Sequence, residues 1–281
     1  MHETRKIRIV SDSSGDLLHM DGVSFGCAPM TVITDEREFR DDETLDLAEM
    51  NEYFAQYKER SHTSCPNVQD WLAAFGDADD IFCTAITSRL SGSYSAACAA
   101  KKIYEESHPG ARVFVVDTLS AGPEITLLLH RIREMVAEGL PFEEICEEIG
   151  QYTAHTGLLF MLSSLQNFAA NGRVSPAAAR LVGLFGIRVV GKASDEGELE
   201  PLTKCRGEMH ALKSLAAHMR HEGYCGGKVR IAHCRNLGAA EKLREILQSV
   251  FLSAEIEISE LRGLCSYYAQ DAGLLVGFEK R

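Results

Sequence analysis

The first half of the chain alternates short apolar runs with segments whose apolar residues recur at helical spacing. Three runs have the length and composition of buried strands: 7–10, 81–86 and 113–116. A helical stripe follows Asn67, and an Ala-rich segment that opens at Ser91 predicts another helix. Strands that alternate with helices pair in parallel through right-handed crossovers. We therefore predict an α/β fold whose N-terminal domain, residues 1–155, is a parallel, Rossmann-like α/β/α unit.

The second half has a different pattern. Two strand-like runs, 187–190 and 199–204, flank Asp195-Glu196-Gly197, which is a hairpin signal. Two further segments, 207–221 and 238–252, have apolar residues at helical spacing. Three further runs, 229–234, 254–261 and 274–278, are strand-like. A hairpin combined with helices predicts an α+β domain with a mixed or antiparallel sheet over residues 156–281. No Pro/Gly-rich linker marks the boundary near residue 155.

Composition narrows the class of protein. The net charge of -12 repels phosphate backbones, so we expect no nucleic-acid partner. The 9 cysteines include no C-x-x-C pair, and several lie in apolar runs, as expected of small buried residues in a reducing compartment. No segment has the length of a membrane span, and residues 1–10 do not resemble a signal peptide. We predict a soluble, cytoplasmic protein.

Two polar segments directly precede predicted helices and contain the candidate binding residues, which are Thr63 and Ser64 in segment 61–67 and Ser91, Gly92 and Ser93 in segment 87–94. Helix N-termini present unpaired N–H groups and partial positive charge, so two of them with adjacent hydroxyls suit a carboxylate or phosphate. The same hydroxyls serve equally well as N-caps, and spacing alone does not decide between the two interpretations.

Five short motifs, taken in order, resemble those of the DegV family. They are Ser-Asp-Ser-Ser-Gly-Asp-Leu at 11–17, His-Thr-Ser-Cys-Pro at 62–66, Ser-Arg-Leu-Ser-Gly-Ser-Tyr at 88–94, Asp-Thr-Leu-Ser-Ala-Gly at 117–122 and Asn-Gly-Arg at 171–173. Arg206 falls where the family has an Arg after the hairpin. The resemblance spans essentially the whole chain, and the ordered set is more specific than any one motif.

The resemblance implies a two-domain fold that holds one long-chain fatty acid, such as palmitate, stearate or oleate, between and inside the domains. It also implies a partner, the catalytic subunit of a fatty acid kinase, which phosphorylates the carboxylate to an acyl phosphate for phospholipid synthesis. In this interpretation the chain is a lipid-binding protein without catalytic residues, a metal or a cofactor of its own. The second domain, with its apolar segments 157–162 and 181–190, is expected to line the acyl tunnel.

The resemblance also assigns residues to the site. Thr63 and Ser91 are expected to hydrogen-bond the carboxylate with help from Ser64, Gly92 and Ser93, and Arg206 is expected to supply positive charge. Loop or partner contacts are expected from Asp12, Ser13, Gly172 and Arg173. The chain departs from the family near its C-terminus, where segment 266–273 lacks the usual His and Pro. Tyr267 is the residue that we expect to replace this His as a donor.

Two alternatives remain. Ser91 lies at a predicted strand-to-helix turn, so it could be the nucleophile of a hydrolase or acyl transferase. Against this, its surroundings are not G-x-S-x-G, and His62 and His233, the candidate bases, lie in separate segments. His218 and His221 with Cys225 could suggest a metal site, but two histidines on a solvated helix face explain the spacing better.

Overall fold

The structure, a computed structural model, describes residues 5–175 and 186–281. Its first half forms a parallel sheet from the apolar runs that the sequence predicts. The strand order is β2 (Ser24–Ala28), β1 (Ile7–Asp12), β6 (Asp80–Ala85) and β7 (Arg112–Asp117). All neighbours pair in parallel, and Val10 lies opposite Cys83 in the centre of the sheet. Because β6 is buried along its whole length, its sequence does not show the alternation of apolar and polar residues that a half-exposed strand has.

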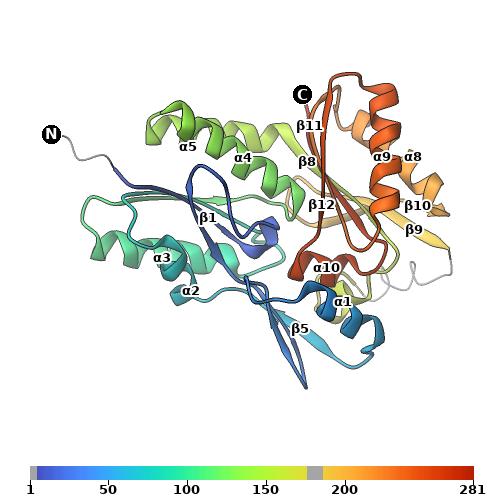
Figure 1. Cartoon of the computed structure of the whole chain (residues 1–281), viewed down its shortest axis with the longest axis horizontal. Helices are drawn as coiled ribbons and strands as arrows, with labels where there is room; N and C mark the ends of the chain where they lie inside the picture. Colours follow the sequence, from blue (N-terminus) through green and yellow to red (C-terminus); the bar gives the residue numbers. More distant parts are fainter. Residues whose placement is uncertain (1–4, 176–185) are drawn as a thin grey trace.

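Helices cover both faces of this sheet (Figure 1). One face carries α2 (Val68–Phe75) and α3 (Ser93–Ser107), which bury Trp71 and Tyr104. The other face carries α4 (Pro123–Glu138) and α5 (Phe142–Tyr152), which bury Ile125 and Ile149. Gly139, in the left-handed conformation at φ 78°, ends α4. The result is the three-layer α/β/α arrangement.

The second sheet is mixed. Its strand order is β10 (Leu199–Arg206), β9 (Ile187–Ala193), β8 (Thr156–Leu162), β13 (Leu274–Glu279), β11 (Gly227–His233) and β12 (Ala254–Glu260). Only β11 and β12 pair in parallel. Helices α8 (Glu208–His221) and α9 (Leu237–Val250) cover one face. The start of α4 packs against the other face so closely that a Cβ at Gly277 of β13 would lie 2.5 Å from the backbone N of Glu124. The two sheets therefore share α4.

A small third sheet was not predicted from the sequence. It consists of β4 (Glu38–Arg40), β3 (Thr31–Thr34) and β5 (Ser61–Ser64), all antiparallel, and α1 (Leu47–Gln56) packs against it. Short helices α6 (Gln166–Ala170) and α10 (Gly263–Ala269) and the 3-10 turns Ser13–Gly15 and Thr153–His155 complete the described elements. The polar segment 61–67 therefore begins as a strand that the sequence analysis did not predict. Pairing with β3 makes a strand of four residues that have no apolar alternation.

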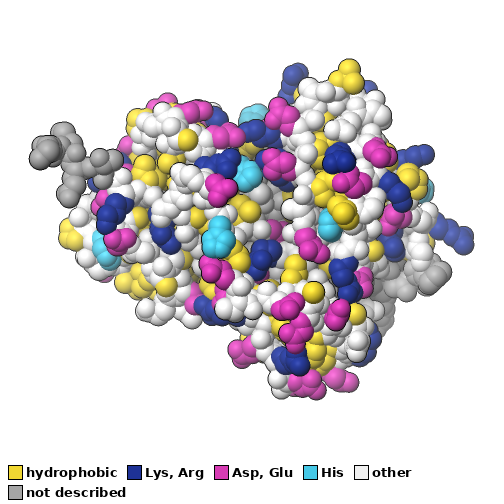
Figure 2. Space-filling view, viewed as in Figure 1, with side chains coloured by type: hydrophobic (Ala, Val, Ile, Leu, Met, Phe, Trp, Pro, Cys, Tyr) yellow, Lys and Arg dark blue, Asp and Glu magenta, His cyan; other side chains and the backbone are white. Residues whose placement is uncertain are grey.

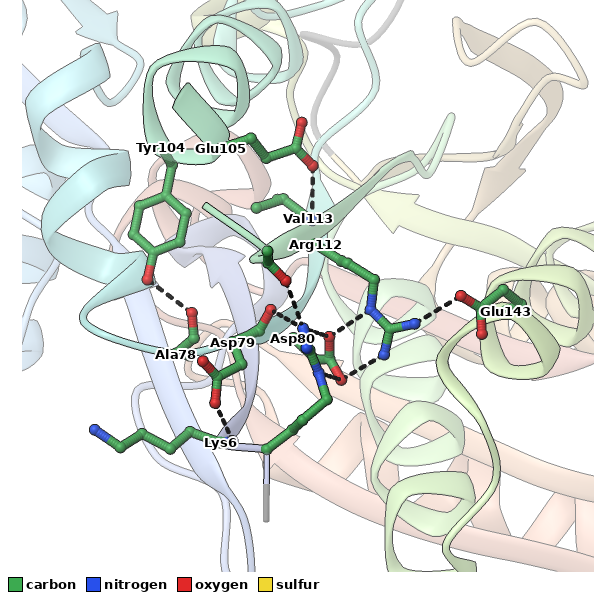
Figure 3. A network of polar contacts seen from close by, with 11 residues as sticks. Lys6, Ala78, Asp79, Asp80, Tyr104, Glu105, Arg112, Val113 and Glu143 are labelled. Carbon is green, nitrogen blue, oxygen red and sulfur yellow. Dashed lines mark hydrogen bonds and ion pairs between the residues drawn. The ribbon is translucent and has the colours of Figure 1, made fainter. Parts of the chain in front are cut away.

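A network of ion pairs closes the amino ends of the parallel strands (Figure 3). Arg112 holds both carboxylate oxygens of Asp80 at 2.7 Å, and Arg5 donates to the same carboxylate. Burial alone would raise the pKa of Asp80, but the two guanidinium groups hold this pKa below its ordinary value. In parallel α/β sheets, ligands bind at the opposite edge, at the carboxyl ends of the strands.

These observations confirm the predicted fold class: a parallel N-terminal sheet with helices on both faces, followed by a mixed sheet. The mixed sheet begins at Thr156, and the domain boundary near residue 155 stays our prediction. Among the described residues no helix has both the length and the apolar character that a membrane crossing requires. Acidic and basic side chains are interspersed on the face shown in Figure 2.

Candidate functional site

An apolar cavity of about 310 Å³ lies at the carboxyl ends of β6 and β7, where the parallel sheet meets the mixed sheet. Leu158, Phe160 and Leu162 of β8 face it, because alternate residues of a strand point to the same side. Loops after β6 and β7, the edge of β5, helices α6 and α10, β13 and the β9–β10 hairpin form most of the remaining wall. Segment 181–190 was also expected to line the acyl tunnel. Its residues 181–185 lie outside the described part of the chain.

Polar groups gather at one end of this cavity. Its wall there includes Thr63, Ser64, Ser91, Gly92 and Arg173, and the structure therefore brings together segments that are more than a hundred residues apart in the chain. An added Cβ at Gly92 would lie 3.4 Å from the Cys65 sulfur, so this end is narrow. Hydroxyls and a guanidinium at the end of an otherwise apolar cavity suit an elongated molecule with an anionic head group.

Thr63 is held in place from two sides. Its backbone N–H donates to Asn171 Oδ1 at 3.2 Å, and its Oγ1 lies 2.9 Å from the hydroxyl of Tyr268. Tyr268 lines the cavity and stacks on Phe168 with ring centroids 4.5 Å apart. Burial raises the pKa of Tyr268, so its hydroxyl stays neutral and able to donate. Neither Asn171 nor Tyr268 was among the predicted site residues.

Tyr267, the predicted replacement for the family His, does not line the cavity. Its hydroxyl lies 2.7 Å from Ser61 Oγ and accepts from Asn171 Nδ2 at 3.0 Å, and its ring packs on Phe54. Successive residues of a helix point about 100° apart, so only one of two adjacent tyrosines in α10 faces the cavity. The prediction is corrected to Tyr268.

The two predicted helix starts are not equivalent. Asn67 accepts hydrogen bonds from the backbone N–H groups of Gln69 and Asp70, and Asp70 caps the Asn67 N–H in return, so α2 satisfies its own donors. Helix α3 has Gly92 at its N-cap and no side-chain cap. The Ser93 N–H donates to Ser91 Oγ at 3.3 Å, and no other described side chain caps this first turn. Of the two predicted helix starts, the start of α3 therefore keeps donors for an anion.

Ser93, Asp12 and Ser13 lie behind the cavity rather than in it. All three residues are fully buried. Ser93 Oγ donates to Asp12 Oδ2 at 2.6 Å, and the Ile86 N–H donates to the same oxygen at 3.0 Å. Ser13 Oγ accepts from the Met30 N–H at 3.0 Å. Burial raises the pKa of Asp12. These side chains fix the loops that form the cavity wall. Ser93 does not line the cavity, which corrects the prediction of a ligand contact for it. For Asp12 and Ser13, burial favours the loop contacts of the prediction over partner contacts.

Among the described residues, the arginine in the cavity wall is Arg173 and not Arg206. Arg173 lines the cavity, and its Nε donates to the Leu90 carbonyl at 3.1 Å while Nη1 donates to the Asn171 carbonyl. It has no carboxylate partner among the described residues. Arg206 is exposed at the last position of β10, an edge strand, and does not line the cavity. Gly172, at φ 71°, supplies the left-handed turn that precedes Arg173.

The tip of the β9–β10 hairpin joins the loop after β6 at the rim of the cavity. Thr87 Oγ1 donates to the Gly197 carbonyl at 2.9 Å, and Arg89 pairs with Glu198 at 2.8 Å. A Cβ at Gly197, where φ is 80°, would lie 2.2 Å from Thr87 Oγ1. Glu198 is thus paired with Arg89, and Arg173 at the polar end has no ion-pair partner among the described residues.

The surroundings of Ser91 do not resemble those of a nucleophile. Ser91 Oγ accepts from the Ser93 N–H at 3.3 Å, and within the described ranges no histidine forms a hydrogen bond with it. His62 is exposed on β5, and His233 lies in another sheet, at the end of β11. Across residues 5–175 and 186–281 no group of three or more His, Cys, Asp or Glu side chains is placed to hold a metal ion.

The fold and this site define a class: α/β proteins in which an apolar cavity with a polar end lies where a parallel sheet meets a mixed sheet. Comparison with known proteins identifies the family. Residues 6–276 match the family described as "Uncharacterised protein, DegV family". A DegV domain-containing protein of Streptococcus pneumoniae is 38% identical over 276 residues, which are 97% of this chain and 98% of that protein. The chain belongs to the DegV family.

Two crystal structures share the whole fold. A DegV family protein from Eubacterium eligens, loaded with heptadecanoic acid, is 40% identical and superposes with a TM-score of 0.96, covering 98% of this chain and 100% of that one. The Fatty Acid Kinase (Fak) B3 protein of Streptococcus pneumoniae, loaded with linoleic acid, is 38% identical with the same TM-score and the same coverage. Both relatives therefore bind long-chain fatty acids on this fold.

Proposed function

We propose that this protein binds one long-chain fatty acid in the cavity, with the carboxylate at the end formed by Thr63, Ser91 and Arg173. The observation that carries the proposal is the cavity itself: apolar along β8 and polar at one end, with one arginine that lacks a carboxylate partner among the described residues. The two relatives crystallised with fatty acids support the ligand class.

The energetics are favourable. Each buried methylene contributes about 0.8 kcal/mol, so the alkyl chain of a sixteen-carbon acid contributes on the order of 12 kcal/mol before costs. Lost translation, rotation and chain ordering offset several kcal/mol of this gain. The remainder is compatible with tight binding, so the head group is needed mainly for orientation and for selection of an acid over neutral lipids of the same length.

Each polar group has a role in this proposal. Thr63 Oγ1 and Ser91 Oγ donate to the carboxylate oxygens, and the N-terminal end of α3 stabilises their charge. Arg173 supplies the counter-charge that we had expected from Arg206. Tyr268 orients Thr63 and takes the position at the head group that we had expected for Tyr267. The shape of the apolar cavity wall determines whether palmitate, stearate or oleate is preferred.

Binding is tested by titrating delipidated protein with hexadecanoic acid and with hexadecanol. We expect saturable binding of one acid molecule per chain and weaker binding of the alcohol, which lacks the charge that Arg173 and α3 recognise. Absence of saturable binding for acids of every chain length tried would remove the proposal.

We further propose that the protein is the non-catalytic, lipid-carrying subunit of a fatty acid kinase system in the cytoplasm. The similarity to the Fak B3 protein supports this role, and so does the position of the carboxylate end, near the surface at Arg173 and Glu198. The test combines the loaded protein, ATP and the catalytic subunit of a fatty acid kinase, with hydroxylamine to trap acyl phosphate as a hydroxamate. We expect hydroxamate only when all three components are present. Its formation without the kinase would show that the chain is itself an enzyme.

A further inference from the structure

An amide side chain that does not line the cavity joins three segments around its polar end. Asn171 directly follows α6 and is half-buried. Its Oδ1 accepts from the Thr63 N–H at 3.2 Å. Its Nδ2 donates to the Asn167 carbonyl at 2.9 Å and to the Tyr267 hydroxyl at 3.0 Å, with a longer contact of 3.5 Å to the Ser61 carbonyl. The amide therefore links α6, β5 and α10.

The partners of this amide fix its orientation. A backbone N–H can only donate a hydrogen bond, and a backbone carbonyl can only accept one. The oxygen of Asn171 therefore faces the Thr63 N–H, and its nitrogen faces the Asn167 carbonyl. The opposite orientation would set an N–H against an N–H and an oxygen against a carbonyl, and both bonds would be lost.

The strand that carries Thr63 depends on this contact. β5 is an edge strand of the third sheet, and β3 pairs with it on one side. On the other side, Asn171 Oδ1 occupies the place that the carbonyl of a further strand would have, and it satisfies the Thr63 N–H. Because β5 is only four residues long and polar, this bond is needed to hold the Thr63 hydroxyl at the cavity wall.

Asn171 also contacts the arginine of the site, through its main chain. The Asn171 carbonyl accepts from Arg173 Nη1, and the Leu90 carbonyl accepts from Arg173 Nε at 3.1 Å. One residue thus holds Thr63 with its side chain and Arg173 with its backbone. Two groups that bind the same carboxylate need a fixed separation, because hydrogen bonds weaken steeply when their geometry is lost.

From these contacts we propose that Asn171 is the positioning residue of the head-group site. It holds the Thr63 hydroxyl in place for the carboxylate that Arg173 attracts, and it acts through Thr63 rather than on the ligand. The inference rests on the proposed function and extends it. A substitution at 171 that removes the amide keeps the main-chain carbonyl, so Arg173 retains this acceptor. The loss should therefore fall on the contribution of Thr63 alone.

The test is a double-mutant cycle on delipidated protein with hexadecanoic acid as the ligand. In the native background, Thr63→Val should weaken binding about five- to tenfold, because the carboxylate loses a donor. Asn171→Ala should weaken binding about three- to tenfold, because it displaces the same donor. In the Asn171→Ala background, Thr63→Val should then cost less than about twofold, since the hydroxyl is already out of position.

Asn167→Ala is the matched control. Asn167 lies in the same helix, and its Nδ2 donates to the Tyr267 carbonyl at 2.6 Å, so it fixes α6 to α10. Among the described residues it forms no hydrogen bond with β5. Asn167→Ala should lower the melting temperature, as Asn171→Ala does, but Thr63→Val should keep its full native cost in that background. A merely structural role of Asn171 would make the two backgrounds behave alike.

Asn171→Gly also keeps the carbonyl that holds Arg173, and it serves for the same cycle if the Ala variant does not fold. Native affinity in the Asn171 variants, or a cost of Thr63→Val that is the same with and without the amide, refutes the inference while fatty-acid binding stands. If the native protein binds no fatty acid, or if Thr63→Val leaves its affinity unchanged, the proposed head-group site itself fails.

Discussion

Arg173 is the residue whose removal separates head-group recognition from acyl-chain burial. The change is Arg173→Gln, which removes the charge and keeps a polar side chain of similar reach. Arg173 donates to the carbonyls of Leu90 and Asn171 and has no carboxylate partner in the described part of the chain. We therefore expect its charge to act on a bound ligand and not on a protein carboxylate.

The expected magnitude follows from the position of Arg173. A hydrogen bond to a charged group contributes about 1.5–3 kcal/mol when buried. Arg173 is only half-buried, so solvent screens part of this interaction, and we expect a loss of about 1–2 kcal/mol. This corresponds to about five- to thirtyfold weaker binding of a fatty acid.

The assay measures the affinity of hexadecanoic acid and of hexadecanol by displacement of a fluorescent fatty acid. Arg173→Gln should weaken the acid and leave the alcohol unchanged, since the alkyl chain is buried equally in both. Arg206→Gln is the matched control, because Arg206 is exposed and does not line the cavity. The reasoning is refuted if both ligands weaken together in Arg173→Gln, or if Arg206→Gln selectively weakens the acid to the same extent.

Four further substitutions have expected results. Tyr268→Phe removes the partner of Thr63 Oγ1 but keeps the ring stack, so fatty acids should bind about threefold to tenfold more weakly, whereas Tyr267→Phe should alter thermal stability more than affinity. Gly191→Ala would place a Cβ 2.3 Å from the Phe160 ring, so chemical denaturation should show a loss of about 1–3 kcal/mol. Asp80→Asn should cost about 1–3 kcal/mol at pH 7. Because its folded pKa is depressed, the contribution of Asp80 is present above its unfolded pKa of about 4 and is lost as pH falls through the folded pKa. The difference from native protein should therefore shrink as the pH is lowered below about 4.

Much of the fold could be predicted from the sequence, because buried helices and strands have apolar residues in regular patterns. The runs around Val10 and Cys83 are apolar since both faces of the parallel sheet are covered, and Gly139 marks the end of α4. The strands of the small third sheet show no such apolar pattern. Ser61–Ser64 is a strand only because β3 pairs with it, and nothing local in four polar residues distinguishes that strand from a loop.

The candidate site was only partly predictable. Thr63 and Ser91 were found because hydroxyls before a helix are a local signal. The choice of Tyr268 over Tyr267 depends on the rotation of α10 about its axis, and the choice of Arg173 over Arg206 depends on which strand lies at the edge of the mixed sheet. Both are matters of tertiary packing. Helical periodicity over 263–269 was the one available signal for Tyr268, and without knowing which face of that segment is buried it did not decide between the two tyrosines.

Native mass spectrometry of freshly purified protein, followed by lipid extraction from the same sample, tests the central claim most directly. The account predicts a single adduct per chain that extracts as a long-chain fatty acid, and its disappearance after delipidation with recovery on addition of the acid. A bare chain that also fails to take up added fatty acids would contradict the account, and the family fold would then serve another ligand.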